Sequence, residues 1–275
     1  MNNYLEKSKK YKGYHYSELN PHELSYLHER TLKMLKVIIP IFEKNNVRYM
    51  ICGGTLLGAM TAGKFIPWDD DVDICVFEDD YEKSIDLLRR QIPSWMFVQW
   101  YGSEKKYFHG WAKIRDKHSH VYPDISSYSQ NGVWVDLYKL TLTKKCLVPY
   151  QITKEHLDYL ERRYIVGDIS EKEKKKRIEE NKLFSKLELQ KEALSSSVDS
   201  EDTFVIWSAS KIVVDKKWVF PRKRVLFEGM ELFTFNKPEC YLINHYGENY
   251  NTLPPDDMRR VGINRIDFFE SGEPE

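Results

Sequence analysis

Four aspartates stand close together where the chain enters a run of apolar residues. Asp69, Asp70 and Asp71 are consecutive, and Asp73 follows one residue later. Because successive side chains of a strand point to opposite faces, Asp71 and Asp73 would share one face while the residues between and after them face a core. Carboxylates at the edge of a core are costly unless a cation pairs with them. Two of them on one face suit Mg²⁺, which takes one or two carboxylates and completes its shell with water and phosphate oxygens.

A glycine turn precedes these aspartates. Gly53 and Gly54 are followed by Thr55, near which a helix is expected to begin. Backbone N–H groups at a helix N-terminus bind anions, so the amides of Gly54 and Thr55 are candidates for holding phosphate. A two-metal site needs a further carboxylate, and Asp136 is the candidate because it lies in the apolar run Val133–Leu137. Together with the aspartate pair, this arrangement predicts metal-dependent phosphoryl chemistry.

Two other kinds of site share parts of this segment. Asp69, Asp71 and Asp73 match the first three ligand positions of an EF-hand loop, but Ile74 stands where that loop requires glycine. The segment from Gly58 to Phe65 resembles a P-loop, but it ends on phenylalanine where a magnesium-binding Ser or Thr is required. Both are rejected. The remaining alternative is a solvated acidic turn, which the glycine pair and the strand context disfavour.

The elements expected to position these residues follow from periodicity and turn signals. Helical spacing predicts helices over Pro21–Asn45, from near Thr55, and over Asp79–Arg90, and β-type runs predict strands at Val47–Cys52, Val72–Phe77, Phe97–Trp100, Trp111–Ile114 and Val133–Leu137. We expect three units: residues 1–150 as the catalytic core with an N-terminal helix, 151–200 as a charged helical insertion, and 201–275 as an aromatic, loop-rich part packing on the core.

Composition limits the class of protein. Lys and Arg total 42 and Asp and Glu also total 42, so the net charge is zero and nothing favours a nucleic-acid partner. Hydrophobic residues make up 41%, which is typical of a globular chain. No apolar stretch is long enough to span a bilayer, and the charged N-terminus lacks a secretory signal. We therefore expect a cytoplasmic protein, with a peripheral position at the inner face of the membrane left open.

The four cysteines are isolated from one another. Cys52, Cys75, Cys146 and Cys240 form no C-x-x-C pair and sit among apolar neighbours. Such spacing does not suit a zinc or redox motif, so all four are predicted to be buried thiols.

The chain resembles a known family. The block Gly-Gly-Thr-Leu-Leu-Gly from Gly53, followed by Phe-Ile-Pro-Trp-Asp-Asp-Asp from Phe65, resembles the signature of the LicD family, related to the fukutin-type proteins within the nucleotidyltransferase superfamily. The resemblance extends over roughly Leu24 to Pro255 through shorter matches at Lys113–Asp116, Val135–Leu137, Phe227–Gly229, Tyr246-Gly247 and Pro254-Pro255. It implies an α+β fold, a nucleotidyltransferase-like mixed sheet flanked by helices.

The resemblance also implies an activity. Family members transfer phosphocholine from CDP-choline to surface glycans, so the expected cofactor is Mg²⁺, the donor is a nucleotide diphosphate such as CDP-choline, and the acceptor is a glycan hydroxyl, free or lipid-linked. The implied catalytic and metal residues are Asp71, Asp73 and Asp136, and the candidates for substrate binding are Gly53, Gly54, Thr55, Lys64, Trp68, Lys113 and Arg115. Trp68 is the candidate for the quaternary ammonium, because aromatic faces bind such groups.

One segment departs from the family pattern. Where members commonly have a basic pair between the glycine turn and Phe65, this chain has Thr61-Ala62, with Gly63-Lys64 in reversed order. Two alternative functions therefore stay open. The same fold would serve a nucleotidyltransferase that moves NMP onto a sugar, small molecule or protein, releasing pyrophosphate instead of CMP. It would also serve a non-catalytic glycan- or partner-binding protein.

Overall fold

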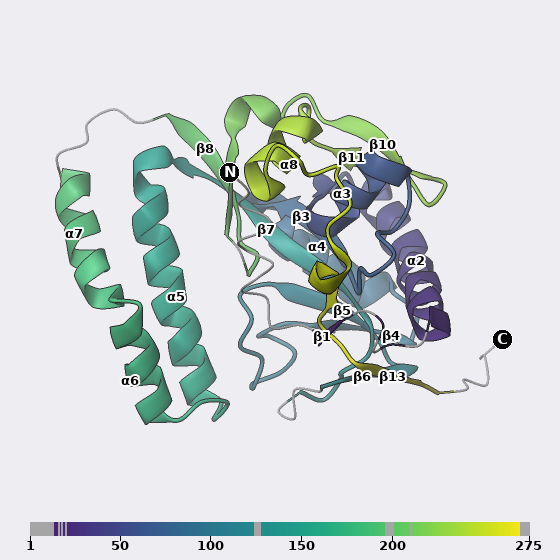
Figure 1. Ribbon diagram of the computed structural model, residues 1–275, viewed down its shortest axis with the longest axis horizontal. Helices are drawn as coiled ribbons and strands as arrows, with labels where there is room; N and C mark the ends of the chain where they lie inside the picture. The colour runs from purple at the N-terminus through teal and green to yellow at the C-terminus, as the bar shows by residue number, and fades with distance from the viewer. Residues whose placement is uncertain are drawn as a thin grey trace.

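The fold is described from a computed structural model, which covers residues 14–15, 17, 19, 21–123, 128–195, 201–209 and 211–269. Its centre is a mixed seven-stranded sheet in the order β2-β3-β7-β5-β4, with β8 paired to β7 and β9 to β8 (Figure 1). These strands are β2 (Tyr49–Ile51), β3 (Val72–Phe77), β4 (Met96–Gln99), β5 (Ala112–Asp116), β7 (Trp134–Lys144), β8 (Asp202–Ile206) and β9 (Ile212–Asp215). The mixed α+β class predicted from the sequence is confirmed.

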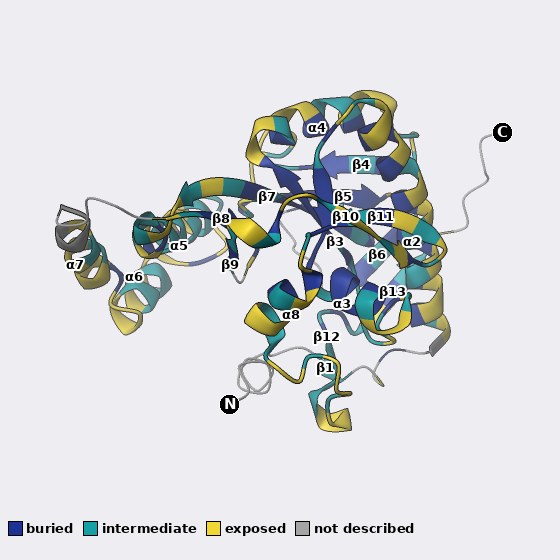
Figure 2. Cartoon of the chain, turned by 90° about the horizontal axis from the view of Figure 1, so that it is seen from above, coloured by how far each residue is buried: buried dark blue, intermediate teal, exposed yellow. Residues whose placement is uncertain are grey.

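One parallel pair lies at the middle of this sheet. Strands β3 and β7 run parallel, whereas β2, β5 and β8 are antiparallel to the strands they join. Strand β7 runs on to Lys144, beyond its predicted end at Leu137, because its second half pairs with β8. Strand β3 and the first half of β7 are largely buried, so they lie in the core (Figure 2).

Three helices near the sheet come from the first part of the chain. They are α2 (Pro21–Lys44), α3 (Gly53–Ala62) and α4 (Glu78–Gln91), all close to the predicted ranges. Helix α2 buries Leu27, Leu35, Ile38 and Phe42 completely, at the spacing expected for one face of an amphipathic helix. Helices α2 and α4 contact each other and β7, and α3 contacts β3. The core therefore extends from the sheet into these helices.

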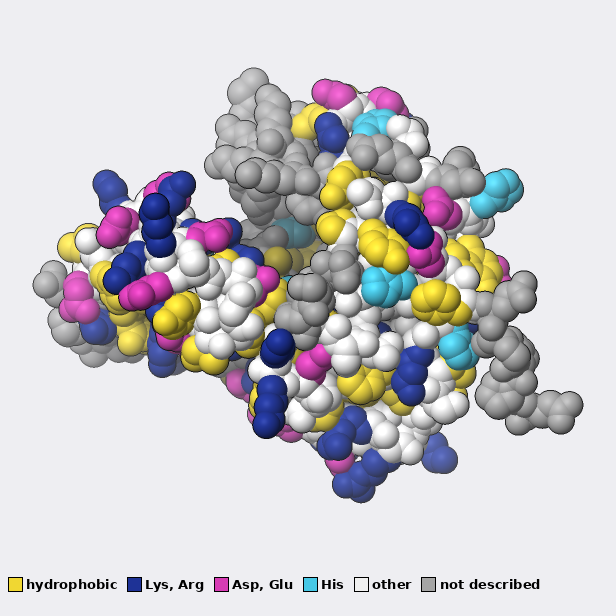
Figure 3. Space-filling view, turned by 90° about the horizontal axis from the view of Figure 1, so that it is seen from below, with side chains coloured by type: hydrophobic (Ala, Val, Ile, Leu, Met, Phe, Trp, Pro, Cys, Tyr) yellow, Lys and Arg dark blue, Asp and Glu magenta, His cyan; other side chains and the backbone are white. Residues whose placement is uncertain are grey.

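A helical extension leaves the sheet after β7. Helices α5 (Val148–Ile165), α6 (Glu171–Glu180) and α7 (Leu183–Ser195) stand beside the main body (Figures 1 and 2). They bury a small cluster of their own, made of Leu160, Ile169 and Leu183. Acidic and basic side chains mix over their surface (Figure 3), as in the pair of Lys175 with Glu171. Within the described ranges, the structure contains no helix of sufficient length and apolarity to cross a bilayer.

After this extension the chain returns to the sheet. Strands β8 and β9 pair with it directly, and a hairpin of β10 (Lys223–Phe227) and β11 (Met230–Thr234) precedes α8 (Pro238–Tyr246). Helix α8 contacts α3. Short strands complete the molecule: β1 (Tyr14–His15) pairs with β12 (Arg260–Val261), and β6 (Ser119–Tyr122) pairs with β13 (Arg265–Phe268).

The prediction for the cysteines was wrong for two of the four. All are free thiols, and Cys52 and Cys75 are buried as expected, but Cys146 and Cys240 are only partly buried. Cys146 lies at the junction of β7 with α5, and Cys240 lies in the first turn of α8. Both positions are at the outside of the core, where apolar neighbours in the sequence do not guarantee burial.

Candidate functional site

Charged side chains form a row across the central strands. In the strand register, Asp73 of β3 pairs with Asp136 of β7, and Asp136 pairs with Lys113 of β5. Residues at paired positions of neighbouring strands project to the same face of a sheet. The sheet therefore sets two carboxylates and one ammonium side by side, although the three residues lie far apart in the sequence.

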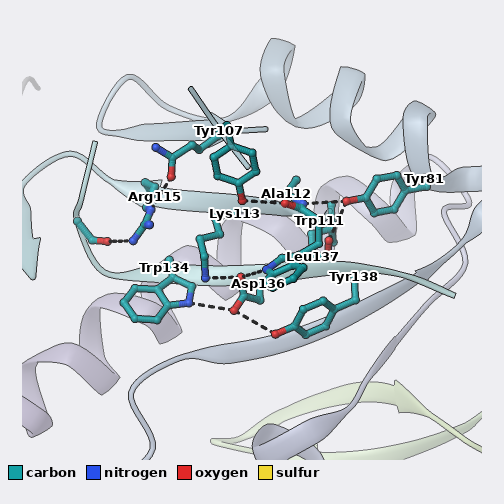
Figure 4. A network of polar contacts seen from close by, with 12 residues as sticks. Tyr81, Tyr107, Trp111, Ala112, Lys113, Arg115, Trp134, Asp136, Leu137 and Tyr138 are labelled. Carbon is teal, nitrogen blue, oxygen red and sulfur yellow. Dashed lines mark hydrogen bonds and ion pairs between the residues drawn. The ribbon is translucent and has the colours of Figure 1, made fainter. Parts of the chain in front are cut away.

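Asp136 is held by four donors (Figure 4). Its Oδ1 accepts hydrogen bonds from Lys113 Nζ at 2.7 Å and from Trp111 Nε1 at 2.8 Å. Its Oδ2 accepts from Trp134 Nε1 at 3.0 Å and from the Tyr138 hydroxyl at 3.1 Å. A carboxylate offers about four acceptor positions, so these contacts use them all. Asp136 is thereby fixed in place, and a cation bound to it would replace one of these donors.

Asp71, Asp73 and Asp136 come close enough to share a cation. Each offers a carboxylate oxygen, and these oxygens lie within 4.8 Å of one another. Asp73 accepts a hydrogen bond from the Gly54 amide at 3.1 Å. In contrast, the Asp71 carboxylate accepts no hydrogen bond within the part of the chain that the structure describes. A half-buried carboxylate without a donor, beside two others, is the donor set that a hard divalent cation such as Mg²⁺ fits.

The charges of these carboxylates also favour a bound cation. Burial, followed by the negative charge of Asp136, raises the pKa of Asp73 to about 7. Burial and then the charge of Asp73 raise the pKa of Asp71 well above its ordinary value. Burial lowers the pKa of the Lys113 ammonium, and the charge of Asp136 opposes that effect. One ammonium does not offset three crowded carboxylates, so a bound cation would relieve the repulsion between them.

The preceding aspartates extend the acidic group. Asp69, Asp70 and Asp71 also bring carboxylate oxygens within 4.8 Å of one another. Asp70 accepts a hydrogen bond from the Gly262 amide at 2.7 Å, and its pKa is raised to about 6, mainly by burial. Asp69 Oδ2 is buried and has no partner among the described residues. The acidic turn itself is tied to α2, because His28 donates through Nε2 to the Asp69 carbonyl oxygen at 2.7 Å.

The glycine turn fits around these carboxylates. Gly53 has a φ of +54°, and a Cβ built on it would lie 1.9 Å from Asp73 Oδ2. A Cβ on Gly54 would lie 2.6 Å from Asp69 Oδ2. Both positions therefore require glycine for close approach, and the first also requires it for its left-handed backbone. The Gly53 amide donates to the Tyr241 hydroxyl at 2.9 Å, and Thr55 Oγ1 accepts from the Asp73 amide at 2.9 Å.

The remaining predicted residues are spread more widely. Lys64 is exposed at the end of α3. Trp68 is partly buried, and the Arg259 guanidinium lies 5.1 Å from its ring centroid, so a cation already covers one indole face. Arg115 is buried and donates to Gln99 Oε1 at 2.9 Å and to the Gly132 carbonyl at 2.7 Å. Figure 4 shows its guanidinium beside the Asp136 network but without a bond to it.

Sequence reasoning missed the residues that support Asp136. Trp134 and Tyr138 flank it at i−2 and i+2, so strand alternation alone places them on its face and was the signal that could have found them. Trp111 and Trp134 take part through their indole N–H groups, which both donate to Asp136. Tyr241 was also missed, because no local pattern connects α8 to the glycine turn.

Two cavities flank the glycine helix α3. One, of about 180 Å³, is apolar and is lined by aromatic residues that include Phe65, Trp68, Tyr246 and Tyr250. The other, of about 110 Å³, is more polar and includes Gly53 and Asp73 in its lining. Tyr246 of α8 borders both cavities. The group of aspartates therefore has one apolar cavity and one more polar cavity near it.

Comparison with known proteins finds a similarity over the segment that contains this site. Residues 46–167 match the model described as the LicD/FKTN/FKRP nucleotidyltransferase domain. The lipopolysaccharide cholinephosphotransferase LicD of Haemophilus influenzae is 38% identical over 56 residues, which cover 20% of this chain and 21% of that protein. The human ribitol 5-phosphate transferase FKRP is 30% identical over 108 residues, covering 37% of this chain and 22% of that protein.

The matched region contains the metal candidates. All three carboxylates, the glycine turn and Lys113 lie within residues 46–167, whereas β8, β9 and α8 lie beyond them. The chain spans about a fifth of the length of each of these curated relatives. The resemblance predicted from the glycine and aspartate blocks is confirmed: residues 46–167 match the LicD/FKTN/FKRP nucleotidyltransferase domain model.

Proposed function

We propose that this protein transfers a phosphorylated alcohol, with phosphocholine as the first candidate, from a CDP-linked donor to a glycan hydroxyl. In this reaction the hydroxyl oxygen forms a bond to the phosphorus that carries the alcohol and loses its proton. The bond between that phosphorus and the bridging oxygen of the diphosphate breaks, and CMP leaves. We further propose that the sheet and helices around the site form a nucleotidyltransferase-like core.

One observation carries the proposal. Asp71, Asp73 and Asp136 converge within 4.8 Å next to the N-terminal end of α3, in the segment that matches the family. When bound there, Mg²⁺ would neutralise charge on the diphosphate and favour departure of CMP. The three carboxylates would hold the cation, and the positive end of the helix dipole would favour the phosphates beside it.

The other side chains have separate roles in this proposal. Lys113 keeps Asp136 oriented and supplies positive charge next to the reacting phosphates. Gly53, Gly54 and Thr55 let the donor approach the carboxylates closely. The predicted donor contacts of Lys64 and Arg115 stay predictions, and we place them second to Lys113 because, among the described residues, neither forms a hydrogen bond with the acidic group.

The transferred alcohol is proposed from the relatives. LicD of Haemophilus influenzae is named for choline phosphate and human FKRP for ribitol 5-phosphate. A quaternary ammonium would use an aromatic surface, and the apolar cavity at Trp68 offers one. Phosphocholine is therefore the first candidate and ribitol phosphate the second. The proposed acceptor is a glycan precursor, and the proposed location is the cytoplasm or the inner face of the membrane.

The test combines donor binding with product analysis. Thermal unfolding is measured with CDP-choline, CDP-ribitol, CTP and UDP-glucose, with and without Mg²⁺, for the wild type, Asp71→Asn and Asp73→Asn. Asp79→Asn is the matched control because that side chain is 85% exposed on α4. We expect CDP-choline to stabilise the wild type and the control only with Mg²⁺, and to stabilise neither site variant.

The products then decide between the reactions. With a glycan acceptor and CDP-choline, release of CMP supports the proposal. Release of pyrophosphate from CTP would instead show nucleotidyl transfer and would overturn it. Metal-independent glycan binding without turnover of any donor would support the non-catalytic alternative.

A further inference from the structure

A small cavity with a lining of mixed polarity lies next to Asp73, on the side of β8 and α8. It has a volume of about 110 Å³, and its lining includes Gly53, Asp73, Tyr138, Ser208, His245 and Tyr246. The first three residues lie in the family-matched segment, and the last three lie beyond residue 167. The part of the chain that follows the helical extension therefore completes a hollow at the acidic group. Pockets for whole ligands usually measure roughly 300–1,000 Å³, so this one would take a single chemical group.

Ser208 is the unusual residue in this lining. It lies just after β8, in the connection to β9, and is only 7% exposed. Its Oγ is buried without a hydrogen-bond partner among the described residues. A buried hydroxyl without a partner costs free energy, so such groups in native proteins call for an explanation. A rotation of the Ser208 side chain would turn this hydroxyl toward the cavity, where a ligand group would supply the missing partner.

The surroundings indicate which group that would be. The N-terminal end of α3, a ten-residue helix that begins at Gly53, borders the cavity and favours negative charge there. Asp73 borders it too, and its carboxylate would repel an anion unless a divalent cation lay between them. A phosphoryl group bound together with Mg²⁺ satisfies both conditions, because its oxygens accept from a hydroxyl and also coordinate the metal.

We propose that Ser208 is a donor-binding residue, and that its hydroxyl donates to a phosphoryl oxygen of the donor diphosphate in this cavity. This inference rests on the proposed function, since it assigns a residue to the diphosphate of that donor. It makes binding of the phosphoryl group depend on the metal. It also brings a residue from outside the matched segment into the site.

The test separates binding from folding. Calorimetric titrations with inorganic pyrophosphate, CDP-choline and cytidine, in the presence of Mg²⁺, are run on the wild type and Ser208→Ala. Ser185→Ala, an exposed serine of α7, is the matched control. Because Ser208 Oγ is buried without a partner in the described protein, its removal should leave the melting temperature unchanged or raise it. We expect pyrophosphate and CDP-choline to bind roughly tenfold more weakly, the effect of one hydrogen bond to a charged group, and cytidine binding to stay as it was.

Each other outcome has a distinct meaning. Unchanged pyrophosphate affinity in Ser208→Ala overturns the inference, and so does an equal loss for cytidine, which would assign the cavity to the nucleoside. A wild type that binds Mg²⁺ but no pyrophosphate overturns it as well. If pyrophosphate binding depends on both Mg²⁺ and Ser208, yet no donor is turned over, the inference stands and the proposed transfer reaction fails.

Discussion

Lys113 and Asp136 form a buried ion pair at directly paired positions of β5 and β7, with Nζ 2.7 Å from Oδ1. Their side chains are 8% and 4% exposed. The Lys113 ammonium also lies 4.4 Å from the ring centroid of Trp134, which itself donates to Asp136. This pairing places a fixed positive charge within the carboxylate group. It fixes one candidate metal ligand and leaves Asp71 without a donor among the described residues.

Removing Lys113 should therefore destabilise the protein. Lys113→Met leaves Asp136 buried with three neutral donors, and breaking a buried ion pair from one side typically costs about 3–5 kcal/mol. We expect about 3 kcal/mol in urea unfolding, because those donors remain. Lys139→Met, on the neighbouring strand β7, removes a more exposed ammonium 3.9 Å from Glu78 and should cost less than about 1 kcal/mol. Equal losses in the two variants would contradict the assignment.

The raised pKa of Asp73 predicts a pH dependence of stability. The pKa is about 7 in the folded protein, against about 3.9 for an unfolded aspartate, so the folded state binds more protons between these values. Without metal, this residue therefore lowers stability progressively as the pH rises from about 4 to about 7. Asp73→Asn removes that effect. When both proteins are measured in EDTA, the melting temperature of Asp73→Asn should exceed that of the wild type by a margin that increases from about pH 4 to about pH 7.

Magnesium should reverse the trend for the wild type. Protons and the cation compete for the same carboxylates, so Mg²⁺ should raise the wild-type melting temperature much more at pH 8 than at pH 5. Asp73→Asn should show little response at either pH. A magnesium effect of equal size at both pH values, or one that survives in Asp73→Asn, would mean that the cation binds elsewhere.

Gly53→Ala should disable the site through backbone and steric effects together. The new Cβ would lie 1.9 Å from Asp73 Oδ2, so the carboxylate or the turn must move, and the φ of +54° adds a left-handed penalty of about 1 kcal/mol. Gly167→Ala is the matched control, since its φ is +80° but no atom of the described residues lies within 4 Å of the added Cβ. Both variants should lose stability, but only Gly53→Ala should lose stabilisation by Mg²⁺.

Local patterns in the sequence predicted most of the elements that carry the site. Strand β3 occupies the predicted range, and α2 ends one residue before its predicted end. Strands β8 and β9 were not identified as members of the sheet, because their short apolar runs follow a long helical segment and resemble ordinary loop sequence. Pairing of β8 with β7 depends on contacts that no local pattern encodes.

The sequence did not predict how the strands pair, and this pairing decides which side chains meet in the site. Strand alternation predicts Asp71 and Asp73 on one face; Asp71 lies just before β3, and the structure does bring the two carboxylates together. The sequence could not show that Lys113 lies opposite Asp136, because the order of the strands decides it. It equally could not show that Tyr241 binds the Gly53 amide or that Ser208 borders Asp73, since both residues lie far along the chain.

The contacts of Arg115 indicate that this residue stabilises the fold. Its guanidinium donates to Gln99 and to the Gly132 carbonyl and lies 5.0 Å from the ring centroid of Trp134. Arg115→Met would leave both acceptors buried without this donor, which should cost about 2–4 kcal/mol in urea unfolding. Arg265→Met, at an exposed pair on β13, should cost less than about 1 kcal/mol. Because the Arg115 contacts are to the sheet and its loop, we expect the affinity for Mg²⁺ and CDP-choline to change less than threefold. If donor affinity falls tenfold or more while stability is kept, Arg115 contacts the donor directly, as the family resemblance implied.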